Sequence, residues 1–169
     1  MDEILYENDW VELSAISGEG YKYIYSHESR CSGKIVGILP FRYVDERIEY
    51  MLRDEFTPAW STKHNIISSI TGGVENNDVI ETAIHEVREE AGYDINEKNL
   101  IQLGMIRTSK SSDTIYHLFS FDATNLVQRE QHGDGSELEK KAKSFWTRDI
   151  SKSEDALVYT MYYRLHNYI

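Results

Sequence analysis

Apolar and polar positions alternate with two different periods along the 169-residue chain. Short stretches with a period of two, rich in β-branched and aromatic residues, predict strands. Two longer stretches, with apolar residues three and four positions apart, predict helices. The expected strands are residues 10–16, 21–25, 33–40, 48–53, 65–70, 100–107, 114–122 and 143–147. The pattern indicates a single α/β (α+β) domain over residues 1–169, built on a mixed β-sheet.

The first predicted helix covers residues 78–91. Asp78 suits its N-cap, Glu81 three positions later suits a capping box, and Gly92 is a natural stop. One stripe of this helix is apolar and consists of Ile80, Ala83, Ile84, Val87 and Ala91. This stripe predicts that the helix packs on the sheet.

The second predicted helix covers residues 153–169 and closes the domain. Ser153 is its expected N-cap. Leu157, Met161, Leu165 and Tyr168 would line its buried face. The polar stretch before it, residues 125–139, is expected to be a loop.

Three glutamates, Glu86, Glu89 and Glu90, fall on a stripe next to the apolar face of the first helix. Residues three and four apart are neighbours on a helix, so these carboxylates repel one another unless a cation lies among them. Hard oxygen ligands of this kind select Mg²⁺ or Mn²⁺. The alternative is a solvated acidic face, which is common in acidic proteins. The adjacent Gly72 and Gly73 favour the metal site over that alternative.

The stretch GGVENNDVIETAIHEVREEAGY, residues 72–93, resembles the Nudix box, G-x5-E-x7-R-E-U-x-E-E-x-G-U, where U is a bulky apolar residue. Its second half matches at Glu86, Val87, Glu89, Glu90, Gly92 and Tyr93. Its first half departs from the family pattern. His85 stands at the Arg position, Asn77 stands at the first Glu position, and the loop after Gly73 is two residues short.

The resemblance implies a Nudix-type α/β/α sandwich around a mixed sheet. A strand ending MLRDEF and the strands upstream of it are similar to the ADP-ribose pyrophosphatase branch, although the proline usual downstream of the box is missing. In that branch the upstream strands join two subunits into a homodimer. Residues 1–32 would be this antiparallel extension, and Arg53 would bind substrate. The alternation of Tyr21, Tyr23 and Tyr25 also suits core or interface packing, or stacking on a base.

The resemblance further assigns roles within the box. Glu86 and Glu90 would be the main ligands of Mg²⁺ (or Mn²⁺), with Glu89 and the carbonyl of Gly72 completing the set. The general base would be a carboxylate on a later loop, Glu137 or Glu139. His85 is expected to substitute structurally for the arginine by hydrogen-bonding Glu89, in preference to a direct catalytic role.

The composition limits the classes of molecule that the protein is expected to bind. A formal charge of −11 disfavours long nucleic acids and anionic membranes, because both need a basic surface. A phosphorylated small molecule is still compatible, since bound cations reverse the local sign. The single Cys31, the acidic N-terminus and the lack of a long apolar run favour a cytoplasmic protein.

These observations predict Mg²⁺-dependent hydrolysis of the pyrophosphate bond in a nucleoside diphosphate linked to another moiety, such as ADP-ribose or a similar nucleotide sugar. One alternative is a catalytically weak Nudix-fold module that binds a nucleotide or a regulatory partner. The other is a pyrophosphohydrolase of dinucleotides or RNA caps. The identity of the base, sugar and leaving group depends on loops that the sequence does not place.

Overall fold

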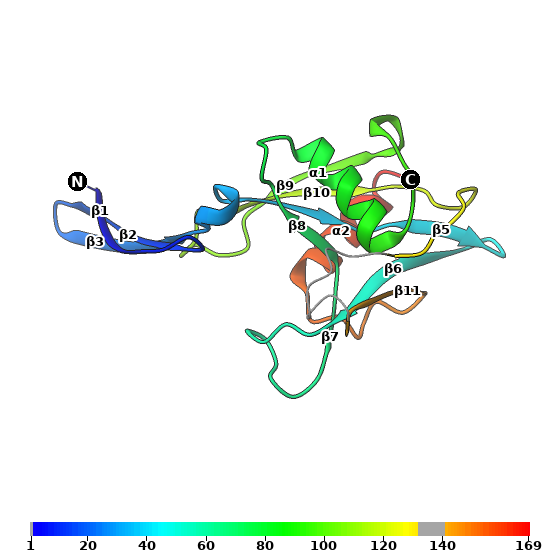
Figure 1. Cartoon of the computed structure of the whole chain (residues 1–169), viewed down its shortest axis with the longest axis horizontal. Helices are drawn as coiled ribbons and strands as arrows, with labels where there is room; N and C mark the ends of the chain where they lie inside the picture. The colour runs from blue at the N-terminus through cyan, green and yellow to red at the C-terminus, as the bar shows by residue number, and fades with distance from the viewer. Residues whose placement is uncertain (1, 132–140) are drawn as a thin grey trace.

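The computed structural model of the protein describes residues 2–131 and 141–169. Its central sheet has the strand order β8-β4-β10-β9 (Figure 1). The strands of this sheet are β4 (Lys34–Ile38), β8 (Ile70–Gly73), β9 (Ile101–Ile106) and β10 (Ile115–Ser120). The β4–β10 pair is parallel and the other two pairs are antiparallel. The sheet is therefore mixed, as the sequence predicts.

Two helices pack against opposite faces of this sheet. They are α1 (Val79–Glu86) and α2 (Ala156–His166). Along β4, Val36 belongs to the core under α1, whereas the Cα of Gly37 faces Leu157 and Met161 of α2. Successive residues of a strand point to opposite faces, so the alternation places the helices on either side. The expected α/β/α sandwich is confirmed.

A second, antiparallel sheet continues the body of the molecule, with the order β11-β6-β5 and β7 paired to β6. Its strands are β5 (Phe41–Val44), β6 (Arg47–Glu55), β7 (Ile66–Ser68) and β11 (Lys143–Thr147). Main-chain pairing of Phe41 with Asp122 joins it to the end of the central sheet. Arg53 lies on β6, the central strand of this sheet, and its side chain contacts Glu90 at the end of the first predicted helix.

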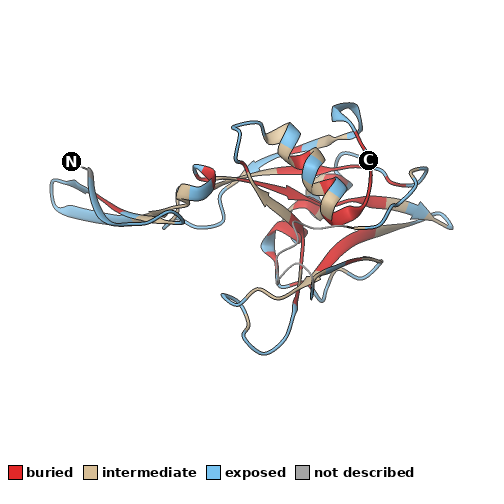
Figure 2. Ribbon diagram, in the orientation of Figure 1, coloured by how far each residue is buried: buried red, intermediate tan, exposed pale blue. Residues whose placement is uncertain are grey.

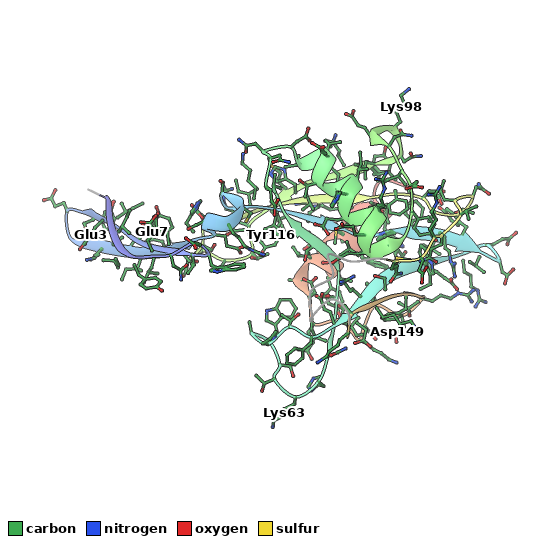
Figure 3. All side chains as sticks on the ribbon, in the orientation of Figure 1. Glu3, Glu7, Lys63, Lys98, Tyr116 and Asp149 are labelled. Carbon is green, nitrogen blue, oxygen red and sulfur yellow. The ribbon has the colours of Figure 1, made fainter. Side chains whose placement is uncertain are left out.

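The N-terminal strands form a sheet of their own that extends away from the body (Figure 1). They are β1 (Asp2–Glu7), β2 (Glu12–Gly18) and β3 (Tyr21–His27). Figure 2 shows this sheet mostly pale blue, the colour of exposed residues, and Glu3 and Glu7 project from it in Figure 3. It joins the body through a short helical turn, η1 (Ser29–Cys31), and through two main-chain bonds: the N–H of Ser26 donates to the carbonyl of Ser111, and the N–H of Asp113 donates to the carbonyl of Ser26.

Several strand predictions need correction. The expected strand that ends at Pro40 is confirmed as β4, whereas β5, directly after Pro40, was not expected. The expected strand 65–70 divides between β7 and β8. The first strand, β1, was not expected at all, since its acidic residues hide the alternation. The expected antiparallel pair of residues 100–107 and 114–122 is confirmed as β9 and β10.

The second helix begins later than the sequence suggests. Asp155, rather than Ser153, is the N-cap of α2, and its carboxylate accepts a bond from the Leu157 backbone at 2.8 Å. Ser153 instead donates its hydroxyl to the carbonyl of Ile67. Leu157, Met161 and Leu165 are buried as expected, whereas Tyr168 lies beyond the helix and is 65% exposed. In the described part of the chain, no helix is long and apolar enough to cross a membrane.

The cap of α2 yields a stability prediction. Asp155 is buried and also accepts a bond from the Ser69 backbone at 3.0 Å, so it ties α2 to the start of β8. Asp155→Ala should lower the free energy of unfolding by about 2–4 kcal/mol, because it removes a helix cap and leaves buried donors without an acceptor. Urea unfolding measures this change. Asp149→Ala, in an exposed turn, is the control and should cost less than about 1 kcal/mol; equal losses would contradict this account.

Candidate active site

The centre of the site is the step from β8 into α1. Asp78 accepts bonds from the backbone of Ile80 and Glu81, each at 3.0 Å, and so fixes where the helix begins. The apolar stripe predicted for this helix packs into the core: Ala83, Val87 and Ala91 are buried, and Ile80 and Ile84 pack beside them. With this stripe held against the sheet, the neighbouring Glu86 faces β8.

Gly72 permits a close approach between β8 and the helix. A Cβ built on Gly72 would overlap the carboxylate and Cγ of Glu86. Glycine at this position therefore leaves the space that the Glu86 side chain occupies, although its backbone is in an ordinary conformation. The carboxylate of Glu86 consequently lies directly against the main chain of β8. The carbonyl of Gly72, on this strand, is the predicted main-chain ligand of the metal.

The helix changes its winding after Glu86. Residues Val87–Ala91, labelled η2, form a π-helical turn, in which main-chain bonds run from residue i to i+5. Gly92 ends it in the left-handed region, with φ of 75°, as the sequence predicts. Such turns are frequent at functional sites, and this one carries Glu89 and Glu90.

His85 lies beside Glu89, as expected from their spacing of four residues. The distance between His85 Nδ1 and Glu89 Oε2 is 3.3 Å. The histidine side chain is 62% exposed, whereas that of Glu89 is 28% exposed. His85 therefore occupies the outer rim of the site, where it contacts one box carboxylate.

Glu90 is the most deeply placed of the three glutamates. Its side chain is 7% exposed and lies 3.0 Å from the Nη2 of Arg53, which is itself 5% exposed. The Nε of Arg53 also donates to Glu55 at 3.1 Å, and the hydroxyl of Ser68 donates to the other oxygen of Glu55 at 2.6 Å. Arg53 is thus held between two carboxylates that line the site.

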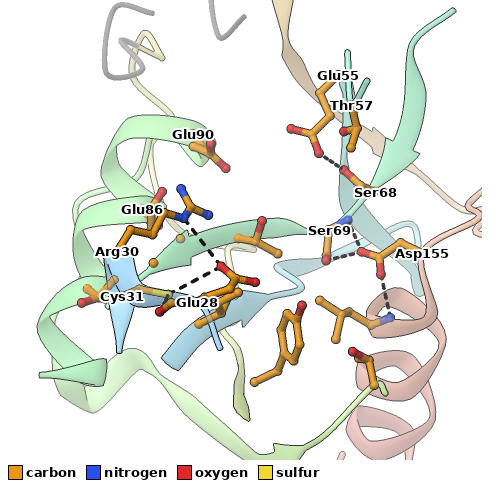
Figure 4. Close-up of a pocket in the computed structure, with 18 of the residues that line it drawn as sticks. Glu28, Arg30, Cys31, Glu55, Thr57, Ser68, Ser69, Glu86, Glu90 and Asp155 are labelled. Carbon is orange, nitrogen blue, oxygen red and sulfur yellow. Dashed lines mark hydrogen bonds and ion pairs between the residues drawn. The ribbon is translucent and has the colours of Figure 1, made fainter. Parts of the chain in front are cut away.

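A single large cavity of about 1190 Å³ opens onto all three box glutamates and onto Gly72. In Figure 4, Glu86 and Glu90 project from their helix toward this cavity, and Glu55 and Ser68 lie on its other side. Nine acidic residues line it: Glu28, Glu55, Glu75, Glu81, Glu86, Glu89, Glu90, Glu154 and Asp155. Among the lining residues that the structure describes, Arg30 is the one Lys or Arg. Two exposed tryptophans, Trp10 and Trp60, complete the rim.

The donor set suits a hard divalent cation in the kind of ligand that it offers. Three carboxylates and Gly72 line the same cavity, and oxygen is the donor that Mg²⁺ and Mn²⁺ prefer. Within residues 2–131 and 141–169, however, no group of three or more His, Cys, Asp or Glu side chains is gathered closely enough to hold a metal ion. The side chains of Glu89 and Glu90 are instead turned toward His85 and Arg53.

The structure therefore brings together Glu86, Glu89, Glu90 and Gly72, with Arg53 behind them. The two expected general bases, Glu137 and Glu139, lie outside the described residues. Sequence reasoning missed Glu55 and Arg30, because neither lies near the box in the chain. The alternation along β6 places Arg53 and Glu55 on one face, which could have indicated Glu55.

Cys31 also lines the cavity and is 2% exposed. Burial and the nearby Glu28 carboxylate raise the pKa of its thiol. A raised pKa disfavours the nucleophilic thiolate form. Cys31 therefore fits the role of a small packing residue.

The fold is shared with solved structures, although the sequence alone matches no protein-family model and no curated protein. The crystal structure of an ADP compounds hydrolase aligns with a TM-score of 0.70 and 13% identity, over 99% of this chain and 91% of that one. The NUDIX domain of Shewanella oneidensis NrtR, crystallised with ADP ribose, aligns with a TM-score of 0.56 and 12% identity, over 78% and 87%. The chain therefore has the Nudix fold, and the first alignment extends over its N-terminal sheet.

The close approach at Gly72 yields a second prediction. Gly72→Ala should displace the carboxylate of Glu86 and weaken Mn²⁺ binding by about 10-fold or more. The free energy of unfolding should change by less than about 1 kcal/mol, because the end of a long side chain moves more easily than the backbone. Titration with Mn²⁺, followed by urea unfolding, measures both.

Gly73→Ala is the matched control. A Cβ on Gly73 would lie 3.1 Å from the Cβ of Cys31 and would not meet Glu86. This variant should therefore keep its Mn²⁺ affinity. Unchanged Mn²⁺ binding in Gly72→Ala would show that the position of Glu86 does not matter for the metal.

Proposed function

We propose that the protein is a Nudix-type pyrophosphohydrolase that uses Mg²⁺ or Mn²⁺ to cleave a nucleoside diphosphate linked to another moiety, such as ADP-ribose. The observation that carries the proposal is the arrangement of Glu86, Glu89 and Glu90 opposite Gly72 on the wall of one cavity. The likeness to the ADP compounds hydrolase shows the fold, and that protein's name supports the choice of substrate class.

Electrostatics supports a requirement for metal. Nine acidic residues line the cavity, whereas a diphosphate is itself an anion. Such a substrate would be repelled from the cavity unless cations changed its local sign. One or more divalent ions among the box carboxylates would make this change where the diphosphate must lie.

Glu86, Glu89, Glu90 and the carbonyl of Gly72 would hold the metal. When bound, Mg²⁺ offsets charge on phosphate oxygens and lowers the pKa of a coordinated water. The contribution of the protein itself is to hold these ligands in place. β8 sets the floor of the site, α1 presents Glu86 across it, and the buried Arg53 holds Glu90. We propose that the general base is Glu137 or Glu139, which precede β11 in the sequence.

A second candidate function is nucleotide binding with little or no turnover. The observation in its favour is the altered first half of the box, with His85 rather than arginine beside Glu89. A neutral imidazole orients a carboxylate less strongly than a guanidinium does. The three retained glutamates argue for hydrolysis, because a binding site has little use for such a costly group of charges.

We also propose that the N-terminal sheet joins two subunits in a homodimer. One face of it presents Ile4, Ile16, Tyr21 and Tyr23 to solvent, and register pairs Ile16 with Tyr23. A three-stranded sheet with this much exposed apolar surface gains stability by covering it.

The single buried Cys31 is consistent with a reducing compartment, and we propose that the protein is located in the cytoplasm.

The function is tested with a panel of ADP-ribose, a diadenosine polyphosphate, NADH and nucleoside triphosphates, each with Mg²⁺ or Mn²⁺. We expect AMP from ADP-ribose, with complete loss after EDTA. Glu86→Gln should lower kcat on the order of 100-fold, because it removes a ligand charge. Chromatography of the products identifies the cleaved bond.

Glu97→Gln, an exposed residue away from the cavity, is the control and should behave like the unaltered protein. Turnover that survives EDTA would contradict the metal requirement. No hydrolysis of any panel member, together with metal-independent ADP-ribose binding, would favour the second candidate.

The dimer is tested by light scattering after size-exclusion chromatography. Ile16→Lys places a charge in the centre of the apolar face and should give a monomer, because burying an unpaired charge is strongly unfavourable. Glu19→Lys, in the exposed β2–β3 turn, should leave a dimer. A monomeric unaltered protein would remove the proposal.

A further inference from the structure

Two arginines lie at the candidate site in contrasting surroundings. Arg53 is 5% exposed and is held by two carboxylates, whereas the side chain of Arg30 is 51% exposed. Arg30 lines the cavity and Arg53 does not appear among its lining residues. The two guanidinium groups therefore face different partners.

Arg53 is fixed from several directions. Its strand, β6, lies between β11 and β7, where Arg53 pairs with Ser144 on one side and Ser68 on the other. Its side chain lies 3.1 Å from Glu55 and 3.0 Å from Glu90, and Glu55 is in turn held by the hydroxyl of Ser68. A planar guanidinium with two oriented partners has little freedom to turn toward a ligand.

Glu90 receives from Arg53 a fixed positive partner that the box itself does not supply. His85, at the arginine position of the box pattern, contacts Glu89 at 3.3 Å. Glu90 lies on the inner side of the π-helical turn and meets β6. The positive charge of Arg53, on β6, thus lies beside Glu90, the most buried carboxylate of the three.

We propose that Arg53 is a positioning residue, which holds Glu90 in place for the metal, and that Arg30 is the arginine that contacts the anionic substrate. This inference rests on the proposed function and deepens it. It reassigns the substrate contact from the buried Arg53 to the exposed Arg30.

Arg30 has what a substrate contact needs. It extends from η1 into the cavity (Figure 4), with its guanidinium 6.0 Å from the ring centroid of Trp10 and its Nε 3.6 Å from Glu28. Its link to Glu28 is long and exposed, so an incoming anion can compete for the guanidinium. Trp10 lines the same cavity and offers a flat apolar surface next to that positive charge.

The experiment compares Arg53→Met, Arg53→Lys, Arg30→Met and Arg42→Met. Arg42→Met is the matched control, because Arg42 forms an ion pair with Glu49 in the same sheet as Arg53 but does not line the cavity. For each variant, Mn²⁺ binding is measured by titration without substrate, and kcat and KM are measured with ADP-ribose. Circular dichroism and urea unfolding report on the fold.

Arg53→Met should weaken Mn²⁺ binding and lower kcat by about 10- to 100-fold each, with KM for ADP-ribose changed less than about 3-fold. Arg53→Lys should recover part of both losses, since it keeps the charge without the planar fork. Arg30→Met should raise KM about 10-fold or more and leave Mn²⁺ affinity unchanged. Arg42→Met should change none of these quantities.

The opposite division would overturn the proposal: Arg53 variants that raise KM while binding Mn²⁺ normally, or an Arg30 variant that leaves KM unchanged. If Arg53→Met does not fold, Arg53→Lys decides the question by the same criteria. The Mn²⁺ titrations, with ADP-ribose binding measured by calorimetry, test both roles without turnover. A failure of the proposed hydrolysis is therefore distinguishable from a failure of this inference.

Discussion

Two carboxylates of the site, those of Glu86 and Glu90, are packed closely against neighbouring strands, and the arrangement of the surrounding elements depends on these contacts. Glu86 can lie against β8 because Gly72 has no side chain, and Glu90 can be buried because Arg53 lies beside it. Burying a carboxylate without such partners is strongly unfavourable. The positions of α1, β6 and β8 relative to one another are thus coupled through two acidic side chains as well as through the apolar core.

The core and the charged site depend on each other. The apolar stripe of α1 packs into a core that also contains Val36 and Phe119 of the central sheet. This packing fixes the rotation of the helix about its axis, and the rotation fixes where Glu86 points. On the opposite face, α2 closes a second core through Met161 and Leu165. The capping carboxylate of Asp155 then connects that layer to the strand segment that leads into the two glycines.

The sequence predicted the elements near the box well, because local chemistry determines them. Asp78, Gly92 and the apolar stripe fix the helix through interactions within about one or two turns. The strand β5 after Pro40 and the division between β7 and β8 could not be predicted, since they depend on which sheet each segment joins. The ion pair of Arg53 with Glu90 joins residues 37 positions apart. Such a contact follows from the order of strands, which periodicity does not give. The same is true of Arg30, which reaches the cavity from a short helical turn with no distinctive pattern.

The π-helical turn at Val87–Ala91 has a further consequence, which concerns sequence change. A π turn holds one more residue than an α turn of the same span, and the added residue shifts the direction of every side chain after it. The turn can therefore be read as a one-residue insertion absorbed by a helix without breaking it. In this helix, Glu86 belongs to the regular part, whereas Glu89 and Glu90 belong to the widened part. Changes of length in this segment would alter the angle between the two groups of carboxylates while leaving their identities intact. A comparison of sequences by residue type alone would overlook that difference.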